Sequence, residues 1–342
     1  MLNKPVAMRD QLLGRILEGM AENKKTFFVS ADFGSPVLDQ IRSHYPGRFV
    51  NVGIAEQNLI NVSAGLALEG FQVFAYAIAP FITMRCFEQS RVNLGLLSEV
   101  RSMNVNLIGV GAGFSYVMSG PTHQCYEDIT IMRSIPNFQI FSPADHHTAG
   151  GLYERCIERK GPKYLRLDAQ VLQSIYNDET RLSDKGFGVH GSGKGAIIVS
   201  TGYMVHGALK AQTLVERDSL GVTVVDLFDL TGFDREALAS LLKEHSVLIS
   251  LEEGFRGRGG LDALLYEILS EYNIPMRYLN LGIDNKYRFE LGSRQELHET
   301  IGLDPVSIGE TIIKFASGHR FSSGHRVDSS QSKLGLFERK TV

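Results

Sequence analysis

The sequence predicts an α/β protein made of two doubly wound domains, and three observations support this prediction. Short apolar runs alternate with helical segments along the chain, which is typical of parallel β-α-β units. The chain has 342 residues, more than a single hydrophobic core usually accommodates. Its 35 glycines are spread along the sequence, as expected for many tight turns between strands and helices.

The first half of the sequence predicts one opening helix followed by alternating strands and helices. Apolar residues from Met8 to Met20 recur at helical spacing, which predicts a helix over 8–22. Two further helices are expected at 54–69, where Gly70 ends the helix, and at 81–97. We expect strands at 27–30, 49–52, 73–76, 105–110, 138–141 and 164–167.

The second half begins after a change in composition. Residues 176–194 lose periodicity and collect Gly, Ser, Asp and Lys, which indicates a boundary between domains. We therefore expect a first domain over 1–178, a linker over 179–194, a second domain over 195–316 and a low-complexity tail over 317–342. In the second domain we expect strands at 196–200, 222–227 and 246–251 and helices at 205–217, 234–243, 259–272 and 306–316.

The composition excludes several classes of protein. Hydrophobic residues make up 43% and charged residues 21% of the chain, so wholesale disorder is excluded. The net charge of −3 leaves no basic excess, which argues against nucleic acid as a partner. No apolar stretch is long enough to span a bilayer, so we expect no membrane partner. The three cysteines form no CxxC pair, which favours a reducing, cytoplasmic compartment and no zinc site.

Two short segments carry residues suited to chemistry. Glu56 follows the end of an expected strand and lies in the first turn of a helix, where open α/β sheets bind ligands. Taken alone, this position is better explained by a carboxylate that complements the helix dipole. His123 lies in a Gly-Pro-Thr-His-Gln turn shortly after another strand, where an imidazole can face a ligand. Arg85 and Glu88 lie on the next helix and could form a surface pair.

The two segments together resemble the pyrimidine-binding half of the transketolase family. Members of that family carry a G-I-x-E-[QH] motif followed by G-P-T-H-Q. The Leu251–Gly254 strand end is similar to the C-terminal domain of the family, and the resemblance covers roughly residues 8–316. Four further matching pieces occur in the family's order: Ala31-Asp32, Pro80-Phe81, Met132–Pro136 and Ser142–Asp145.

One motif of the family is missing from these residues. The family's other half binds a diphosphate and its metal through G-D-G…N, and this sequence contains no Gly-Asp-Gly. The resemblance therefore implies the C-terminal subunit of a split transketolase, inactive alone. An N-terminal subunit would supply the diphosphate and Mg²⁺ ligands, in an α2β2 heterotetramer.

The resemblance also implies a cofactor and a role for individual residues. The cofactor would be thiamine diphosphate, and the reaction would transfer a two-carbon ketol unit from a ketose to an aldose. Glu56 would hydrogen-bond the pyrimidine ring and promote loss of the thiazolium proton, a task that needs a carboxyl with a tuned pKa. Phe81 would stack on the ring, and Asp32 is a further cofactor-binding candidate. His123 would bind the oxygens of the substrate and act in catalysis.

The substrate side departs from the family pattern. Met118-Ser119 occupies the place of a usual acidic residue, and the usual phosphate-binding arginine aligns with Ala169. We take Ser119 and Arg166 as substrate-binding candidates beside His123. The apparent loss of arginines puts the ordinary sugar phosphate in doubt, because a phosphate favours bidentate arginine contacts. We therefore expect either that the companion supplies this charge or that the sugar is unusual.

Three alternatives stay open. A 2-oxoacid dehydrogenase β-subunit has the same two domains, but its corresponding loop usually reads His-Ser-Gln. A 1-deoxyxylulose-5-phosphate synthase shares the Gly-Ile-Ala-Glu-Gln motif but is normally one long chain. A non-catalytic scaffold would have no need to retain Glu56, Phe81 and His123 together.

Overall fold

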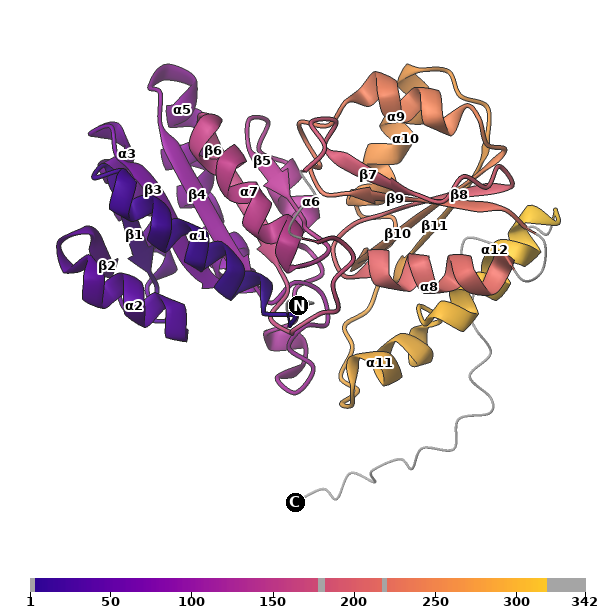
Figure 1. The fold of residues 1–342 in the computed structure, drawn as a ribbon, viewed down its shortest axis with the longest axis horizontal. Coiled ribbons are helices and arrows are strands. Elements are labelled where there is room, and N and C mark those ends of the chain that lie inside the picture. The colour runs from indigo at the N-terminus through magenta and orange to yellow at the C-terminus, as the bar shows by residue number, and fades with distance from the viewer. Residues whose placement is uncertain (1–3, 178–181, 217–219, 319–342) are drawn as a thin grey trace.

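The computed structural model describes residues 4–177, 182–216 and 220–318. Two α/β domains lie side by side, each built around its own sheet (Figure 1). The low-complexity tail expected over 317–342 lies outside the described residues from 319 onward. None of the helices within the described ranges is long and apolar enough to cross a membrane.

The first domain contains a six-stranded parallel sheet with the strand order β2-β1-β3-β4-β6-β5. Because all neighbouring strands run in parallel, their carboxyl ends meet at one edge of the sheet. The six predicted strands are confirmed with small changes at their ends: β1 (Thr26–Ser30), β2 (Phe49–Asn51), β3 (Gln72–Ile78), β4 (Asn104–Val110), β5 (Gln139–Phe141) and β6 (Gly161–Leu167).

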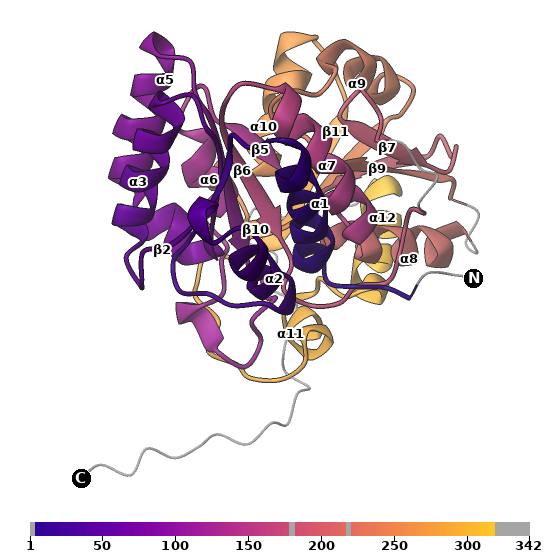
Figure 2. The ribbon, with the colours of Figure 1, turned by 60° about the vertical axis from the view of Figure 1, so that its left-hand side comes forward.

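Helices cover both faces of this sheet. Alternation along β3 sends Phe74 toward one core cluster, with α1 and α7, and Ala75 toward the other, with α3. Figure 2 shows α1 and α3 on opposite sides of the strands. The helices of this domain are α1 (Met8–Glu22), α2 (Pro36–His44), α3 (Glu56–Leu68), α4 (Phe87–Gln89), α5 (Leu97–Val100), α6 (Asp128–Arg133) and α7 (His146–Glu158).

The helix predicted over 81–97 is not a continuous α-helix. It begins with a π-helical turn at Phe81–Arg85, passes through α4 and widens again into a π-helix at Ser90–Leu96. Such wide turns are rare and frequently mark functional sites. Here the first π-turn follows directly from the carboxyl end of β3.

The second domain contains a five-stranded sheet in the order β11-β10-β8-β9-β7, of which only β7 is antiparallel to its neighbour. Its strands are β7 (Phe187–His190), β8 (Ala196–Ser200), β9 (Val222–Leu227), β10 (Val247–Phe255) and β11 (Arg277–Ile283). Its helices are α8 (Met204–Glu216), α9 (Arg235–Leu242), α10 (Leu261–Glu271), α11 (Arg294–Ile301) and α12 (Pro305–Ala316).

Strand β7 corrects the expected extent of the linker. The predicted linker over 179–194 contains this strand, which pairs with β9 along its whole length. Phe187 is buried in the core, so the second domain begins inside the stretch that we interpreted as a connection. Its pairing is with a distant segment, which local composition does not reveal.

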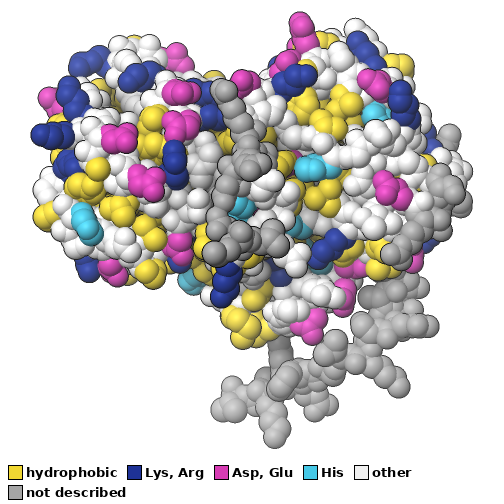
Figure 3. Space-filling model, in the orientation of Figure 1, with side chains coloured by type: hydrophobic (Ala, Val, Ile, Leu, Met, Phe, Trp, Pro, Cys, Tyr) yellow, Lys and Arg dark blue, Asp and Glu magenta, His cyan; other side chains and the backbone are white. Residues whose placement is uncertain are grey.

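Backbone hydrogen bonds and a common hydrophobic cluster connect the two domains. A short segment after β9 pairs with edge strand β5, since the Leu230 N–H donates to the Ile140 carbonyl at 2.8 Å and the Ser142 N–H donates to the Phe228 carbonyl at 2.8 Å. This pairing covers an edge that would otherwise be open. On the face seen in Figure 3, charged and apolar side chains are mixed over both domains without a large area of one kind.

Candidate active site

The sequence-predicted site residues gather at the carboxyl edge of the first sheet. Asp32 follows β1, Glu56 follows β2, Phe81 follows β3, and His123 lies in the long connection after β4. Parallel pairing brings these four strand ends together. The topology therefore places side chains from distant parts of the sequence in one region.

Glu56 is held by an arginine that stacks on Phe81. Glu56 is the first residue of α3 and is 2% exposed. Arg85 Nη1 donates a hydrogen bond to Glu56 Oε2 at 2.7 Å, as an ion pair. The Arg85 guanidinium carbon lies 4.2 Å from the centroid of the Phe81 ring, within cation–π range. The three side chains form one unit across two elements.

The role of Arg85 differs from the expected one. We considered a surface pair between Arg85 and Glu88, but Glu88 pairs with Arg91 on the same helical surface at 2.9 Å. Arg85 closes the π-turn that begins at Phe81, and this turn directs it back toward Glu56. The spacing of four residues between Phe81 and Arg85 is a sequence signal for their stacking, whereas the contact with Glu56 joins segments 29 residues apart.

Aromatic contacts connect Phe81 with the loop after β4. The rings of Phe81 and His123 meet edge to face, with centroids 5.4 Å apart. His123 also faces the Tyr116 ring, with centroids 6.4 Å apart. His123 Nδ1 lies 3.0 Å from the Thr122 hydroxyl oxygen, so a hydrogen bond orients the imidazole. A continuous chain of contacts thus runs from Glu56 to Tyr116.

Asp32 belongs to the frame that supports the site. It has a positive φ of 53° and accepts a hydrogen bond at Oδ1 from Asn51 Nδ2 at 2.9 Å. Asn51 Oδ1 in turn accepts from the backbone N–H groups of Asp32 and Gly53, at 3.1 and 3.0 Å. These contacts tie the ends of β1 and β2 to the turn that precedes Glu56.

Ser119 and Arg166 have different surroundings. Ser119 lies exposed at the tip of the loop that carries His123, and its carbonyl accepts from the Thr122 hydroxyl at 3.3 Å. Arg166 is buried, and it donates to Asp128 Oδ2 at 2.7 Å and to the Glu253 carbonyl at 2.9 Å. Strand β6 thus directs Arg166 inward, beside Tyr164, onto Asp128, and its role toward the substrate stays a prediction.

A cation that the sequence did not single out lies near the same edge of the sheet, beside the carboxyl end of β3. Arg9, near the start of α1, donates to Asp10 Oδ1 at 2.9 Å. It also neighbours two tyrosines. Burial raises the pKa of Tyr116 to about 12, and the positive charge of Arg9 opposes that rise. Burial likewise raises the pKa of Tyr76, and Arg9 opposes it there as well.

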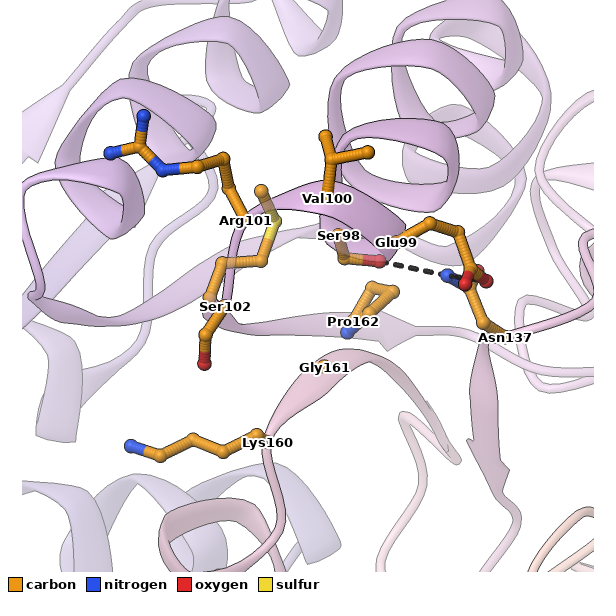
Figure 4. Close-up of a pocket in the computed structure, with 10 residues that line it drawn as sticks. Ser98, Glu99, Val100, Arg101, Ser102, Asn137, Lys160, Gly161 and Pro162 are labelled. Atoms are coloured by element: carbon orange, nitrogen blue, oxygen red, sulfur yellow. Dashed lines mark hydrogen bonds between the residues drawn. The ribbon is translucent and has the colours of Figure 1, made fainter.

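A cavity of about 430 Å³ lies elsewhere on the first domain. Met103 and Gly161, at the amino ends of β4 and β6, belong to its lining, so the cavity lies at the edge opposite Glu56. Figure 4 shows Arg101 and Lys160 coming from different sides of it. No group of three or more metal-binding side chains occurs within the described ranges.

Comparisons with known proteins agree with this architecture. Residues 4–174 match the family described as transketolase, pyrimidine binding domain, and residues 188–308 match transketolase, C-terminal domain. An apulose-4-phosphate transketolase subunit from Actinobacillus succinogenes is 33% identical over 264 residues, which cover 77% of this chain and 83% of that protein. A protein of the same name from Phocaeicola vulgatus is 29% identical over 317 residues, covering 92% of this chain and 99% of that one.

A solved structure described as a split gene transketolase, an inactive β4 tetramer, is also similar. It has a TM-score of 0.82 and 30% sequence identity, and the match covers 91% of this chain and 99% of that one. The fold, the strand-end positions of the site residues and these similarities agree with one another. The chain belongs to the transketolase family and is a transketolase-type transferase subunit of the kind found in its split-gene members.

Proposed function

We propose that this chain works with a companion subunit to transfer a two-carbon ketol unit from a ketose to an aldose, with thiamine diphosphate as the cofactor. The observation that carries the proposal is the unit of Glu56, Phe81 and His123 at one strand edge. It combines a buried carboxyl group, an aromatic face and an imidazole, and Arg85 joins the carboxyl group to the aromatic ring.

The residues fit the ring of this cofactor but not its charged end. Glu56 offers a buried carboxyl that could hold a ring nitrogen, and Phe81 offers a flat apolar face. When bound, thiamine diphosphate supplies a carbon nucleophile for the ketol unit. The described residues contain no acidic cluster for Mg²⁺. We therefore assign the Mg²⁺ and diphosphate ligands to the companion, within an α2β2 heterotetramer.

The exposed apolar groups beside the site support a companion on this face. Ile54, two residues before Glu56, is 75% exposed, and Met118, on the loop of His123, is 75% exposed. We propose that the companion covers both side chains, since exposed apolar side chains that together form a larger area mark contact surfaces. The three cysteines are buried and free, which agrees with a cytoplasmic location.

The substrate is proposed to be a ketose with an anionic end. Two of the similar proteins described above are named for apulose 4-phosphate, a sugar phosphate. In this chain Arg9 is the cation next to Tyr76 and Tyr116, and we propose it as the contact for the anionic end because Arg166 is buried against Asp128. His123 and Ser119 would bind the sugar oxygens, since both lie on the loop that faces Phe81.

Reconstitution tests the proposal. The tagged chain is purified from its native organism, companions are identified by mass spectrometry, and the assembly is supplied with thiamine diphosphate, Mg²⁺ and a panel of ketose phosphates. We expect a companion that carries Gly-Asp-Gly…Asn and ketose-dependent release of an aldose. The chain alone and a Glu56→Ala assembly serve as controls. Full turnover by the Glu56→Ala assembly would refute the role of Glu56.

A further inference from the structure

The loop between β4 and α6 is anchored by charged residues of the second domain. This loop carries Tyr116, Ser119 and His123, so its course decides where the proposed substrate contacts lie. Its tip is exposed at Ser119, whereas its start is buried from Gly111 to Ser115. The buried start is held by a group of ionised side chains from both domains.

Arg294 is the centre of this group. It is 4% exposed, and Nε donates to Glu253 Oε1 at 2.8 Å while Nη2 donates to Glu253 Oε2. Its remaining nitrogen, Nη1, donates to Asp168 Oδ2 at 2.5 Å. The Tyr203 ring covers the guanidinium, with 3.4 Å between its carbon and the ring centroid. Arg294 thus binds two carboxylates at once, with Glu253 from its own domain and Asp168 from the first domain.

Each of the two carboxylates holds one residue of the loop. Glu253 Oε2 accepts from the Phe114 N–H at 3.2 Å. Asp168 Oδ1 accepts from the Ser115 hydroxyl at 2.9 Å. Phe114 and Ser115 are consecutive, and Tyr116 follows directly. The two carboxylates therefore fix the backbone next to Tyr116, whose ring faces His123.

A glycine allows the close approach of the loop to Glu253. Gly113 has a φ of +56°, and a Cβ atom there would lie 1.9 Å from Glu253 Oε2. The backbone of the loop at Gly113 therefore lies in direct contact with the carboxylate of Glu253, which Arg294 orients. His298 Nε2 lies 2.6 Å from Glu253 Oε1 and supports the same carboxylate from α11.

We infer that Arg294 is a positioning residue for the substrate loop, acting through Glu253 on Phe114 and through Asp168 on Ser115. This inference rests on the proposed function of the site. A planar guanidinium can satisfy both carboxylates in fixed directions, whereas an ammonium group cannot reproduce the fork. The second domain therefore contributes to substrate affinity through the direction in which the loop leaves the domain interface.

The test compares Arg294→Gln and Arg294→Lys with a matched change at another buried interdomain ion pair. Arg155 of α7 donates to Asp229 of the second domain at 3.2 Å, and both side chains are buried away from the loop. Arg155→Gln therefore controls for weakened domain contact. Three quantities are measured: melting temperature, hydrogen exchange of residues 111–122 in the free chain, and steady-state kinetics of the assembly with its companion.

We expect both Arg294 variants to speed exchange of 111–122 at least tenfold and to raise KM for the ketose at least tenfold. The affinity for thiamine diphosphate should stay within twofold of the wild type. Arg155→Gln should lower the melting temperature but leave the hydrogen exchange of 111–122 and the KM for the ketose unchanged. If Arg294→Gln does not fold, Arg294→Lys carries the comparison.

Two results would overturn the inference. The first is unchanged exchange of 111–122 in the Arg294 variants, and the second is an equal rise of KM in Arg155→Gln. A wild-type assembly without any ketol transfer would instead count against the proposed function, because the exchange measurement does not depend on turnover.

Discussion

Arg85 donates a 2.7 Å hydrogen bond to Glu56 while its guanidinium lies 4.2 Å above the ring of Phe81. One side chain thus satisfies a buried carboxylate and covers an aromatic face. Those are the two groups that the proposed cofactor ring would contact. A buried carboxylate without a partner is costly, so this arrangement stabilises the free chain.

Glu56→Gln should slow ketol transfer at least about a hundredfold while leaving the fold intact. The amide keeps the shape of the side chain but cannot exchange a proton, and loss of general acid–base action typically costs about 10²–10⁴ in rate. Turnover of the reconstituted assembly is the measurement, with circular dichroism as the check on folding. Glu88→Gln is the matched control, because Glu88 pairs with Arg91 at an exposed position. Activity within tenfold of the wild type would contradict the assignment.

Arg85→Ala should tighten the binding of thiamine diphosphate to the assembly. The change removes a side chain that occupies both Glu56 and Phe81, and it leaves the carboxyl of the free chain without its partner. We expect the dissociation constant to fall several-fold, as measured by titration calorimetry. Arg91→Ala should leave it unchanged, because surface pairs contribute little. Weaker binding in Arg85→Ala would instead make Arg85 a cofactor ligand.

The sequence was sufficient for the elements with strong local signals. The strand at 196–200 and the helix that begins at Glu56 follow from apolar runs and helical periodicity, and the structure has both. Parallel pairing then explains why Glu56, Phe81 and His123 meet, although they are far apart in the chain. These contacts depend on sheet topology, which the alternation of strands and helices already predicts.

Features that depend on distant partners were not predictable in the same way. Arg166 had the right residue type for an anion, but its buried partner Asp128 lies on a different element. Helix α11 was missed because its sequence is mostly polar and charged, with Leu297 and Ile301 as its apolar residues. Its start nevertheless carries a capping box between Ser293 and Glu296, a signal that is visible in the sequence.

Gly113→Ala should destabilise the protein much more than Gly257→Ala. Both glycines have positive φ, of 56° and 72°, so both substitutions strain the backbone by about 1–2 kcal/mol. Only at Gly113 would the new Cβ collide with Glu253, since nothing lies within 4 Å at Gly257. We expect a loss of roughly 2–5 kcal/mol in the free energy of unfolding at Gly113, from strain and overpacking together. Denaturant titration measures the free energy of unfolding of both variants. Equal losses in the two variants would show that the loop at Gly113 is not in close contact with Glu253.

Glu252→Gln should stabilise the protein at high pH but not at low pH. Burial raises the pKa of Glu252 to about 7, with Asp262 adding to the rise and Arg166 opposing it. The folded state therefore binds a proton that the unfolded chain has already lost, and stability falls as the pH rises from about 4.5 to 7.

Glutamine cannot ionise, so the stability of the variant should not fall through this residue as the pH rises. Relative to the wild type, its free energy of unfolding should increase by roughly 3 kcal/mol between pH 4.5 and pH 8, from about 1.4 kcal/mol per pKa unit. Urea titration at the two pH values measures the difference, with the exposed Glu236→Gln as the control. A pH-independent difference would mean that Glu252 is ionised in the folded protein throughout this range. Its carboxylate would then be stabilised by Arg166 and the N–H groups at the start of α10 more strongly than burial penalises it.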